Sequence, residues 1–191
     1  MANEFYALLS RMRNITRWSL MRNTFSENIQ EHSYQVAVLA HALALIRRDI
    51  LHLAAPEPDR CAVAAMYHDV SEILTGDLPT PIKYLNSDIQ SAYKQVEKIA
   101  ANHLLDKLPP QLRESYEHLV LEDDAELLPF VKGADKLSAY IKCIEEQKAG
   151  NTEFDSAAEI TMQALKDMGQ EEIDWFLENC LDAFSRNLDQ L

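Results

Sequence analysis

Four side chains of metal-ligand type stand at separate points along the sequence. His32 precedes an apolar helical stripe, His68 and Asp69 are adjacent in MYHDVSEILTGDLPTP, and Asp135 lies in FVKGADKLSAYIK. Two imidazoles and two carboxylates without a thiolate suit Mn²⁺, Co²⁺, Fe²⁺, Ni²⁺ or Zn²⁺ rather than Ca²⁺. Four protein ligands leave coordination positions open for water and substrate, which is what a catalytic centre requires.

A third carboxylate is expected beside these ligands. Residues 58–73 are predicted to form one helix, in which neighbouring residues are about 100° apart. His68 and Asp69 could then both reach one point beside the helix axis. Glu72 follows them by four and three positions, so it lies on the same side of the helix.

A His-Asp pair alone has little specificity, because so short a motif often occurs by chance. The hydrophobic pattern adds weight, since His32, His68 and Asp135 fall on or beside apolar helix faces. A buried carboxylate is costly unless it is paired or coordinated, and Lys132 and Lys136 point elsewhere on the helix. The open alternative is that both histidines are ordinary core residues and that Asp135 caps a helix or faces solvent.

The elements that must position these residues are predicted to be helices throughout. Glycine is scarce, at four residues, and no segment alternates in the manner of a strand. Residues 14–26 are expected to be irregular. Helices are expected over about residues 4–12, 28–53, 58–73, 87 to the LPPQL break, from there to about 120, over 126–148, and as one or two amphipathic helices after 153.

Several residues predict where these helices begin and end. Asn28 and Glu31 resemble a capping box, which opens a helix with a buried stripe of Val36, Leu39, Leu43 and Ile46. Gly76 is expected to end the helix before it, and the prolines of TGDLPTP make the following loop stiff and non-helical. Ser87 and Asp88 are expected to cap a helix that carries Ile89, Tyr93, Val96 and Ala100 on one face.

Length and charge limit the kind of protein. The 191 residues are predicted to form one domain over 1–191, with the helices from about 151 packing on or extending its core. The net charge of −13 argues against a nucleic-acid polymer as partner. Residues 1–22 carry four arginines against one glutamate, so a small anionic ligand could still bind near this segment.

The compartment is expected to be the cytoplasm. No apolar run reaches the roughly 18–20 residues that span a bilayer, so no membrane association is expected. The N-terminal segment lacks the features of a signal peptide. The cysteines Cys61, Cys143 and Cys180 are odd in number and widely spaced, which indicates reduced thiols rather than disulfides.

The order His32, His68-Asp69, Asp135 resembles the signature of the HD-domain superfamily of metal-dependent phosphohydrolases. The segments ITRWSLMRN, ENIQEHSYQVA, AMYHDVSEILTGDLPTPIKY and KGADKLSAYIKCIEE resemble the bacterial HD-domain 5′-deoxynucleotidases from Ser10 to about Gly150. The resemblance implies an all-α helical bundle of the HD type, which is typically a homodimer. It also implies hydrolysis of deoxyribonucleoside 5′-monophosphates to deoxynucleoside and phosphate with one divalent transition metal, with Co and Mn as first candidates and Fe, Ni, Zn and Cu as further ones.

The resemblance assigns roles to individual residues. Glu72, Arg17 and Asp69 would be catalytic, and the metal ligands would be His32, His68, Asp69 and Asp135. Arg17 would orient the 5′-phosphate, Trp18 would lie against the sugar, and Asp77 would accept a hydrogen bond from its hydroxyl, with no room left for a 2′-hydroxyl. The implied substrate contacts are Arg17, Trp18, His32, Asp69, Asp77, Leu78, Pro79, Thr80 and Asp135.

Residue chemistry supports part of this assignment. The planar donor fork of Arg17 suits phosphate oxygens, whereas Arg11, Arg13 and Arg22 are interpreted as surface residues. A tryptophan such as Trp18 is more often a core residue than a sugar platform.

Three rival functions remain open. They are cleavage of a cyclic or pyrophosphorylated nucleotide by an HD-type enzyme, a non-catalytic nucleotide-sensing module, and a helical scaffold without metal. The sequence leaves undecided the physiological metal, the preferred base, the role of Glu72 as acid or water-orienting base, the role of the C-terminal helices and the dimer interface.

Overall fold

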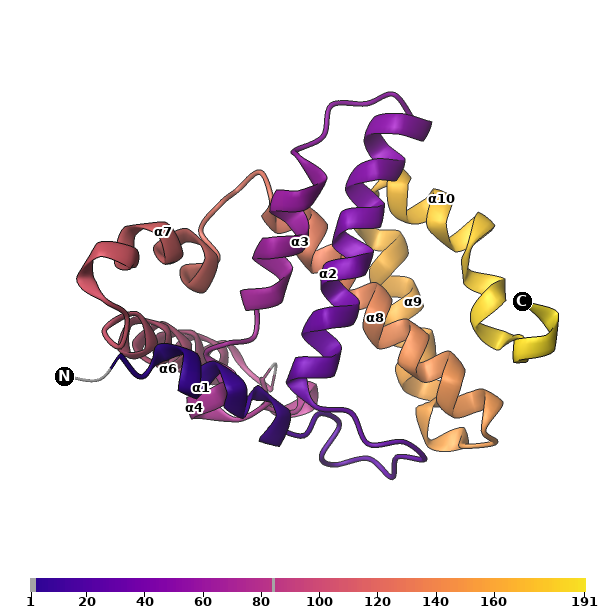
Figure 1. Ribbon diagram of the computed structural model, residues 1–191. Coiled ribbons are helices and arrows are strands. Elements are labelled where there is room, and N and C mark those ends of the chain that lie inside the picture. The colour runs from indigo at the N-terminus through magenta and orange to yellow at the C-terminus, as the bar shows by residue number, and fades with distance from the viewer. Residues whose placement is uncertain (1–2, 84) are drawn as a thin grey trace. The chain divides into compact units, whose positions relative to one another are not determined.

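Helices joined by short turns make up the computed structural model, which describes residues 3–83 and 85–191 (Figure 1). The helices are α1 (Phe5–Leu9), α2 (Ile29–Leu45), α3 (Pro58–Tyr67), α4 (Glu72–Thr75), α5 (Thr80–Lys83), α6 (Ser87–Leu105), α7 (Pro110–Leu121), α8 (Leu128–Lys148), α9 (Asp155–Asp167) and α10 (Glu171–Asn179). Within the described ranges there is no β-strand, and the only bridge joins Thr16 to Asn28. The all-α prediction is confirmed.

Shorter helical turns complete the element order. A π-helical turn, η2 (Ile46–Ile50), extends α2, and the 3₁₀ helices are η1 (Ser10–Asn14), η3 (Thr152–Phe154), η4 (Leu181–Ser185) and η5 (Leu188–Gln190). α2 with η2 ends slightly before the predicted residue 53. The predicted helix over 4–12 is divided into α1 and η1.

Two compact units contain these elements. The first unit comprises Met1–Arg22, Ser26–Ser33 and Met66–Asp124. The second unit comprises Asn23–Phe25, Tyr34–Ala65 and Ala125–Leu191. The single domain over residues 1–191 remains a prediction.

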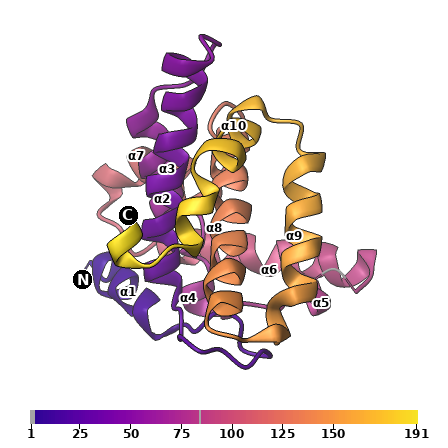
Figure 2. The ribbon, with the colours of Figure 1, turned by 90° about the vertical axis from the view of Figure 1, so that its right-hand side faces the viewer.

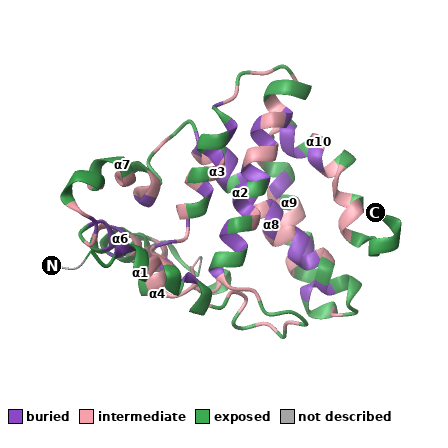
Figure 3. Cartoon of the chain, in the orientation of Figure 1, coloured by how far each residue is buried: buried purple, intermediate pink, exposed green. Residues whose placement is uncertain are grey.

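The second unit has its core along α2 and α8. The stripe Val36, Leu39, Leu43 and Ile46 is buried as predicted, and buried and exposed segments alternate along α2 (Figure 3). α8 and α9 run side by side on either side of the turn at Gly150 (Figure 2). Leu165 of α9 and Ile173 and Phe176 of α10 are buried in the same core. The helices after residue 151 are therefore part of the core of this unit.

The first unit has a separate core. α6 packs against α7, α4 and α1 (Figure 1). The core contains Phe5, Met12, Ile29, Val70, Ala101, Leu104, Leu105, Leu108 and Val120. It therefore gathers side chains from α1, the start of α2, the turn after α3, and the last turns of α6.

The start of α2 confirms the predicted capping box. The side-chain oxygen of Asn28 accepts a hydrogen bond from the backbone N–H of Glu31 at 3.1 Å. In return, the Glu31 carboxylate accepts one from the backbone N–H of Asn28 at 3.3 Å. These reciprocal bonds satisfy N–H groups that a helix terminus leaves without intrahelical partners.

The predicted single helix over 58–73 is wrong in one important respect. α3 ends at Tyr67, residues 68–71 form turns, and α4 begins only at Glu72. Within the turn the N–H of Val70 donates to the carbonyl of Tyr67 at 3.2 Å, which is a three-residue spacing rather than an α-helical one. The turn redirects the chain so that Val70 is buried in the first core. His68, Asp69 and Glu72 therefore converge through a turn and not through helical periodicity.

Smaller corrections concern the segment after Gly76, which ends α4 with a φ of 73° as predicted. α5 begins at Thr80, so the TGDLPTP segment is partly helical, which a proline in the first turn permits. Asn86 rather than Ser87 or Asp88 caps α6, because its side chain accepts from the N–H of Ile89 at 2.8 Å.

The predicted apolar face of α6 is buried only in part. Val96 is 47% exposed, whereas Ala100 is buried and Ile89 and Tyr93 are half-buried. The fully buried residues of α6 lie in its last two turns, where the helix meets the first core. Tertiary packing therefore buries only the C-terminal part of the face that periodicity indicates.

A buried ion pair anchors residues 23–25 to α8 within the second unit. The Glu146 side chain is 0% exposed, and Lys142 donates to it at 2.5 Å. The N–H groups of Thr24 and Phe25 and the Asn151 side chain also donate to this carboxylate, at 2.8 to 3.2 Å. Burial raises the pKa of Glu146, but the hydrogen bonds from Lys142, Asn151 and Thr24 outweigh it and lower the pKa to about 2.

Replacing Glu146 by alanine should destabilise the protein by about 3–5 kcal/mol, because the substitution leaves the Lys142 ammonium buried without its carboxylate. Chemical denaturation measures the loss, with the exposed Glu159→Ala as control, expected within about 0.5 kcal/mol of wild type. The folded pKa lies below the ordinary value near 4.5, so the stabilisation is present above that pH and is lost as the pH falls toward 2. If the difference in the free energy of unfolding between wild type and variant did not narrow over this pH range, the stabilising role of the Glu146 carboxylate would be contradicted.

Candidate active site

The basic N-terminal segment lies beside the start of α2 through a short antiparallel pairing in the first unit. The N–H of Arg17 donates to the carbonyl of Glu27 at 2.9 Å, and the N–H of Ile29 donates to the carbonyl of Ile15 at 3.0 Å. The residues between them, expected to be irregular, form no helix. This pairing brings Arg17 close to the helix that carries His32.

Arg17 and Trp18 both bind one carboxylate. Arg17 Nε and Trp18 Nε1 each donate to Glu27 Oε2 at 3.0 Å. Trp18 has a φ of 57°, a left-handed conformation that is uncommon for a bulky residue. Arg17 Nη1 also donates to Asp69 Oδ2 at 3.4 Å, so the guanidinium lies between two acidic side chains.

His32, His68 and Asp69 converge in the first unit. The Nε2 atoms of His32 and His68 lie 3.5 and 3.1 Å from the same oxygen, Oδ2 of Asp69. Both histidines are buried, and each offers a ring nitrogen within 4.8 Å of the other's. The predicted convergence of these three residues is observed.

This donor set fits a divalent transition metal, because two imidazoles and a carboxylate face one small volume. Burial raises the pKa of Asp69, but the neighbouring His68, His32 and Arg17 outweigh burial and lower that pKa well below its usual range. The carboxylate is therefore ionised, as a metal ligand must be. Asp135 is half-buried on α8, in the second unit, and its place in the ligand set remains a prediction.

Glu72 has the opposite electrostatic environment. Its side chain is buried at the start of α4, and burial together with the charges of Asp69 and Asp77 raises its pKa to about 9. Among the described residues, no group donates a hydrogen bond to its buried Oε2. A carboxyl with this pKa is protonated at neutral pH, so it can donate a proton.

The loop after α4 approaches the same segment of the first unit. The backbone N–H of Trp18 donates to the Asp77 carboxylate, whose pKa is raised by burial and lowered less by Arg17. Leu78 and Pro79 are half-buried, and Thr80 is exposed at the start of α5. The substrate-binding roles of Asp77, Leu78, Pro79 and Thr80 remain predictions.

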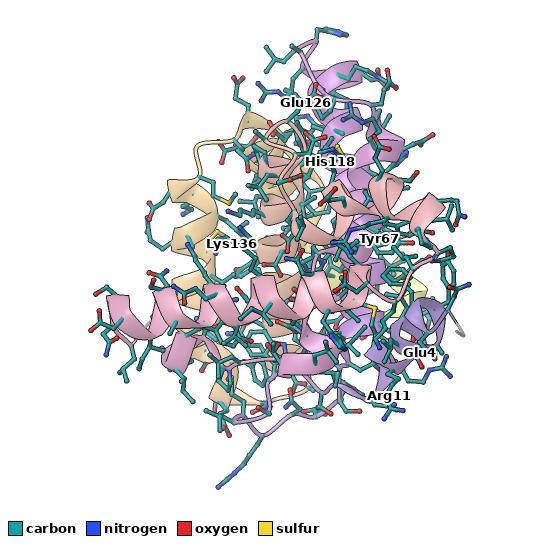
Figure 4. All side chains as sticks on the ribbon, turned by 90° about the vertical axis from the view of Figure 1, so that its left-hand side faces the viewer. Glu4, Arg11, Tyr67, His118, Glu126 and Lys136 are labelled. Carbon is teal, nitrogen blue, oxygen red and sulfur yellow. The ribbon has the colours of Figure 1, made fainter. Side chains whose placement is uncertain are left out.

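The other arginines of the basic segment behave as predicted. Arg11 extends outward from η1 (Figure 4), and Arg13 and Arg22 are also exposed. Arg17, by contrast, has a side chain only 12% exposed. The structure thus separates one half-buried arginine from three exposed ones.

Sequence reasoning missed Glu27 and the Lys83–Glu97 pair. Glu27 lies ten residues after Arg17 and opens the segment ENIQEHSYQVA, but neither its residue type nor its spacing assigned it a role, and only the antiparallel pairing reveals its contact with Arg17. Lys83 Nζ donates to Glu97 at 2.8 Å and lies 5.1 Å from the Tyr93 ring centroid.

None of the helices in the described part of the chain has both the length and the hydropathy that a bilayer crossing demands.

The sequence of this chain is similar to those of proteins named 5′-deoxynucleotidase. The 5′-deoxynucleotidase of Erwinia tasmaniensis is 47% identical over 192 residues, covering 99% of this chain and 96% of the relative. The 5′-deoxynucleotidase of Vibrio cholerae serotype O1 is 44% identical over 191 residues, covering 99% of this chain and 98% of the relative.

Solved structures share the fold. An HD-domain phosphohydrolase of Listeria innocua has a TM-score of 0.80 at 20% identity and covers 95% of this chain and 88% of its own. The HD phosphohydrolase of cyanophage S-2L, bound to dA and one catalytic Zn²⁺ ion, has a TM-score of 0.64 at 21% identity and covers 93% and 96%. A model for proteins described as 5′-deoxynucleotidase YfbR-like matches residues 4–184, and the chain therefore belongs to this family of 5′-deoxynucleotidases.

Proposed function

We propose that this chain, an HD-domain 5′-deoxynucleotidase, converts deoxyribonucleoside 5′-monophosphates to deoxynucleosides and phosphate at the site around Asp69. The observation that carries the proposal is the convergence of two buried imidazoles and Arg17 on one ionised carboxylate. Relatives that bear the name 5′-deoxynucleotidase at 44 to 47% identity support the substrate class.

The metal ligands in this proposal are His32, His68, Asp69 and Asp135. The ion is a divalent transition metal, with Co or Mn as first candidates and Fe, Ni, Zn and Cu as others that suit the same donors. When bound, it supplies Lewis-acid activation of a phosphoryl oxygen and lowers the pKa of water. The Zn²⁺ described for the cyanophage phosphohydrolase supports a metal of this class.

Glu72 acts as the general acid in this proposal. Its raised pKa keeps the carboxyl protonated at neutral pH, so it can give a proton to the departing 5′-oxygen. A role as water-orienting base would require the ionised form, which burial and the charge of Asp69 disfavour.

Arg17 orients the phosphate. Its guanidinium is held on one side by Glu27 and reaches Asp69 on the other, so its charge lies next to the proposed metal ligands. A fixed cation there stabilises the equatorial oxygens as charge redistributes during phosphoryl transfer.

Trp18 and the loop from Asp77 to Thr80 receive the deoxyribose in this proposal. The hydrogen bond from the backbone N–H of Trp18 to the Asp77 carboxylate holds these two segments together. We further propose that the protein works as a homodimer in the cytoplasm. Within the described residues, Cys61, Cys143 and Cys180 form no disulfide with one another, which supports a reducing compartment.

Chelation followed by metal add-back, with phosphate release from a panel of deoxy- and ribonucleoside 5′-monophosphates, tests the function. We expect release from the deoxynucleotides, its loss on chelation, and its return with a transition metal such as Co²⁺ or Mn²⁺. Cleavage confined to cyclic or pyrophosphorylated nucleotides, or full activity in the chelated enzyme, would contradict the proposal.

The Glu72→Gln substitution should lower kcat by about 10²–10⁴-fold while metal content is retained, because the amide cannot donate a catalytic proton. In wild type, kcat should fall as the pH rises through the apparent pKa of the acid. Between pH 4.5 and about 9 the Glu72 carboxyl is ionised in the unfolded protein but protonated in the folded protein. The raised pKa therefore destabilises the folded wild type over this range. The variant should therefore gain melting temperature relative to wild type between pH 5 and about 9. Undiminished turnover would remove Glu72 from the mechanism.

Arg17→Ala should reduce kcat/KM for a deoxynucleotide by about 10²–10³-fold, because it removes a preorganised cation from the site. Steady-state kinetics measure this loss. The matched control is Arg13→Ala, which removes an exposed arginine of the same segment and should leave kcat/KM unchanged. Equal losses in both variants would indicate a general effect of positive charge rather than a defined phosphate contact.

A further inference from the structure

Glu27 makes an unusual pair of contacts for a residue outside the HD signature. One of its oxygens, Oε2, accepts hydrogen bonds at 3.0 Å from both Arg17 Nε and Trp18 Nε1. The Glu27 side chain is only 13% exposed, so water weakens these bonds little. Arg17 and Trp18 are the residues proposed to hold the phosphate and the sugar.

The backbone explains how two consecutive side chains reach one oxygen. In an extended strand, neighbouring side chains point to opposite faces. Trp18 instead has a φ of 57°, which turns the chain so that its indole and the Arg17 guanidinium meet at Glu27. Such a conformation is unfavourable for a residue with a Cβ and persists only where surrounding contacts fix it.

A second tether comes from the backbone of Glu27 itself. Its carbonyl accepts from the N–H of Arg17 at 2.9 Å, next to the bridge between Thr16 and Asn28. Glu27 thus holds both the main chain and the side chain of Arg17. Because Nε is bound to Glu27, Nη1 is directed to Asp69, where it lies 3.4 Å from Oδ2.

We propose that Glu27 is a positioning residue that fixes the phosphate-orienting Arg17 and the sugar-facing Trp18 as one unit. Its carboxylate acts through these two residues and touches neither the metal nor the substrate. Loss of Glu27 should therefore impair phosphate orientation and discrimination against ribonucleotides together. The inference rests on the proposed function, whose residue roles it extends.

The test is Glu27→Gln, which keeps the size of the side chain and removes its charge. We expect kcat/KM for a deoxynucleoside 5′-monophosphate to fall about 10–100-fold, and its ratio to the matching ribonucleotide to fall with it. Metal content and melting temperature should stay close to wild type. Glu27→Asp, which restores the charge at shorter reach, should recover part of the lost kcat/KM.

A double-mutant cycle separates positioning from a general structural role. If Glu27 acts through Arg17, then Glu27→Gln in an Arg17→Ala background should cost clearly less in kcat/KM than it does in the wild-type background, because one of the two partners of Glu27 is already absent. A full, additive loss in that background would overturn the proposal.

Tryptophan fluorescence gives a readout independent of turnover. The chain has two tryptophans, so a Trp175→Phe background reports on Trp18 alone. Glu27→Gln should shift the Trp18 emission and make it more accessible to iodide, and unchanged emission with unchanged kcat/KM would overturn the inference.

The matched control is Glu31→Gln, the same change at an exposed carboxylate of the α2 capping box, which should leave kinetics and emission unchanged.

A wild-type enzyme that releases no phosphate from deoxynucleotides would refute the proposed function, whereas an active wild type with an unaffected Glu27→Gln variant would refute only this inference.

Discussion

The ionised carboxylate of Asp69 in a buried position is the constraint on which the site depends. Burial alone would favour its protonated form. His68, His32 and Arg17 surround it and more than reverse that effect, so the anion persists. The requirement is reciprocal, since the Arg17 guanidinium lies 3.4 Å from Asp69 and would lose this counter-ion if the carboxyl were protonated. Each of the four residues is therefore best understood as a member of one electrostatic group.

The anion at Asp69 also determines the state of its neighbour. Glu72 lies close enough for the charges of Asp69 and Asp77 to raise its pKa beyond the effect of burial. Two carboxylates in one small region thus take opposite protonation states, one suited to ligate and one suited to donate a proton. Separation of acid and anion by environment is a general way for one site to carry out both tasks at neutral pH.

Two local features of the site oppose folding. Trp18 adopts a left-handed conformation, and the buried Oε2 of Glu72 has no hydrogen-bond partner among the described residues. Both features oppose folding, and the two hydrophobic cores offset them. The functional region is therefore one in which local preferences give way to tertiary contacts.

Much of this could be predicted from the sequence. The capping box at Asn28 and the buried stripe through Val36 and Leu43 follow from hydrogen-bonding and helical period, and the structure confirms them. The break after Tyr67 could not be predicted, because MYHDVSEIL has no glycine or proline and its turn depends on burying Val70 in the first core.

The contacts of Glu27 escaped prediction for a related reason. They depend on an antiparallel pairing between Arg17 and Glu27 within a segment that has no regular period. The resemblance to a family identified Arg17 and Trp18 as site residues. It did not identify Glu27, the carboxylate that holds them. Contacts of this kind arise from the path of an irregular chain, which local sequence preferences do not specify.

The proposed site binds one transition-metal ion through the imidazoles of His32 and His68 and the carboxylates of Asp69 and Asp135. X-ray absorption at the cobalt edge of the Co²⁺-loaded protein tests it most directly, because the spectrum identifies the scattering atoms around the ion. We expect one tightly bound metal ion per chain, with two imidazole ligands and otherwise oxygen ligands. A spectrum without imidazole scattering, or with sulfur in the coordination sphere, would contradict it.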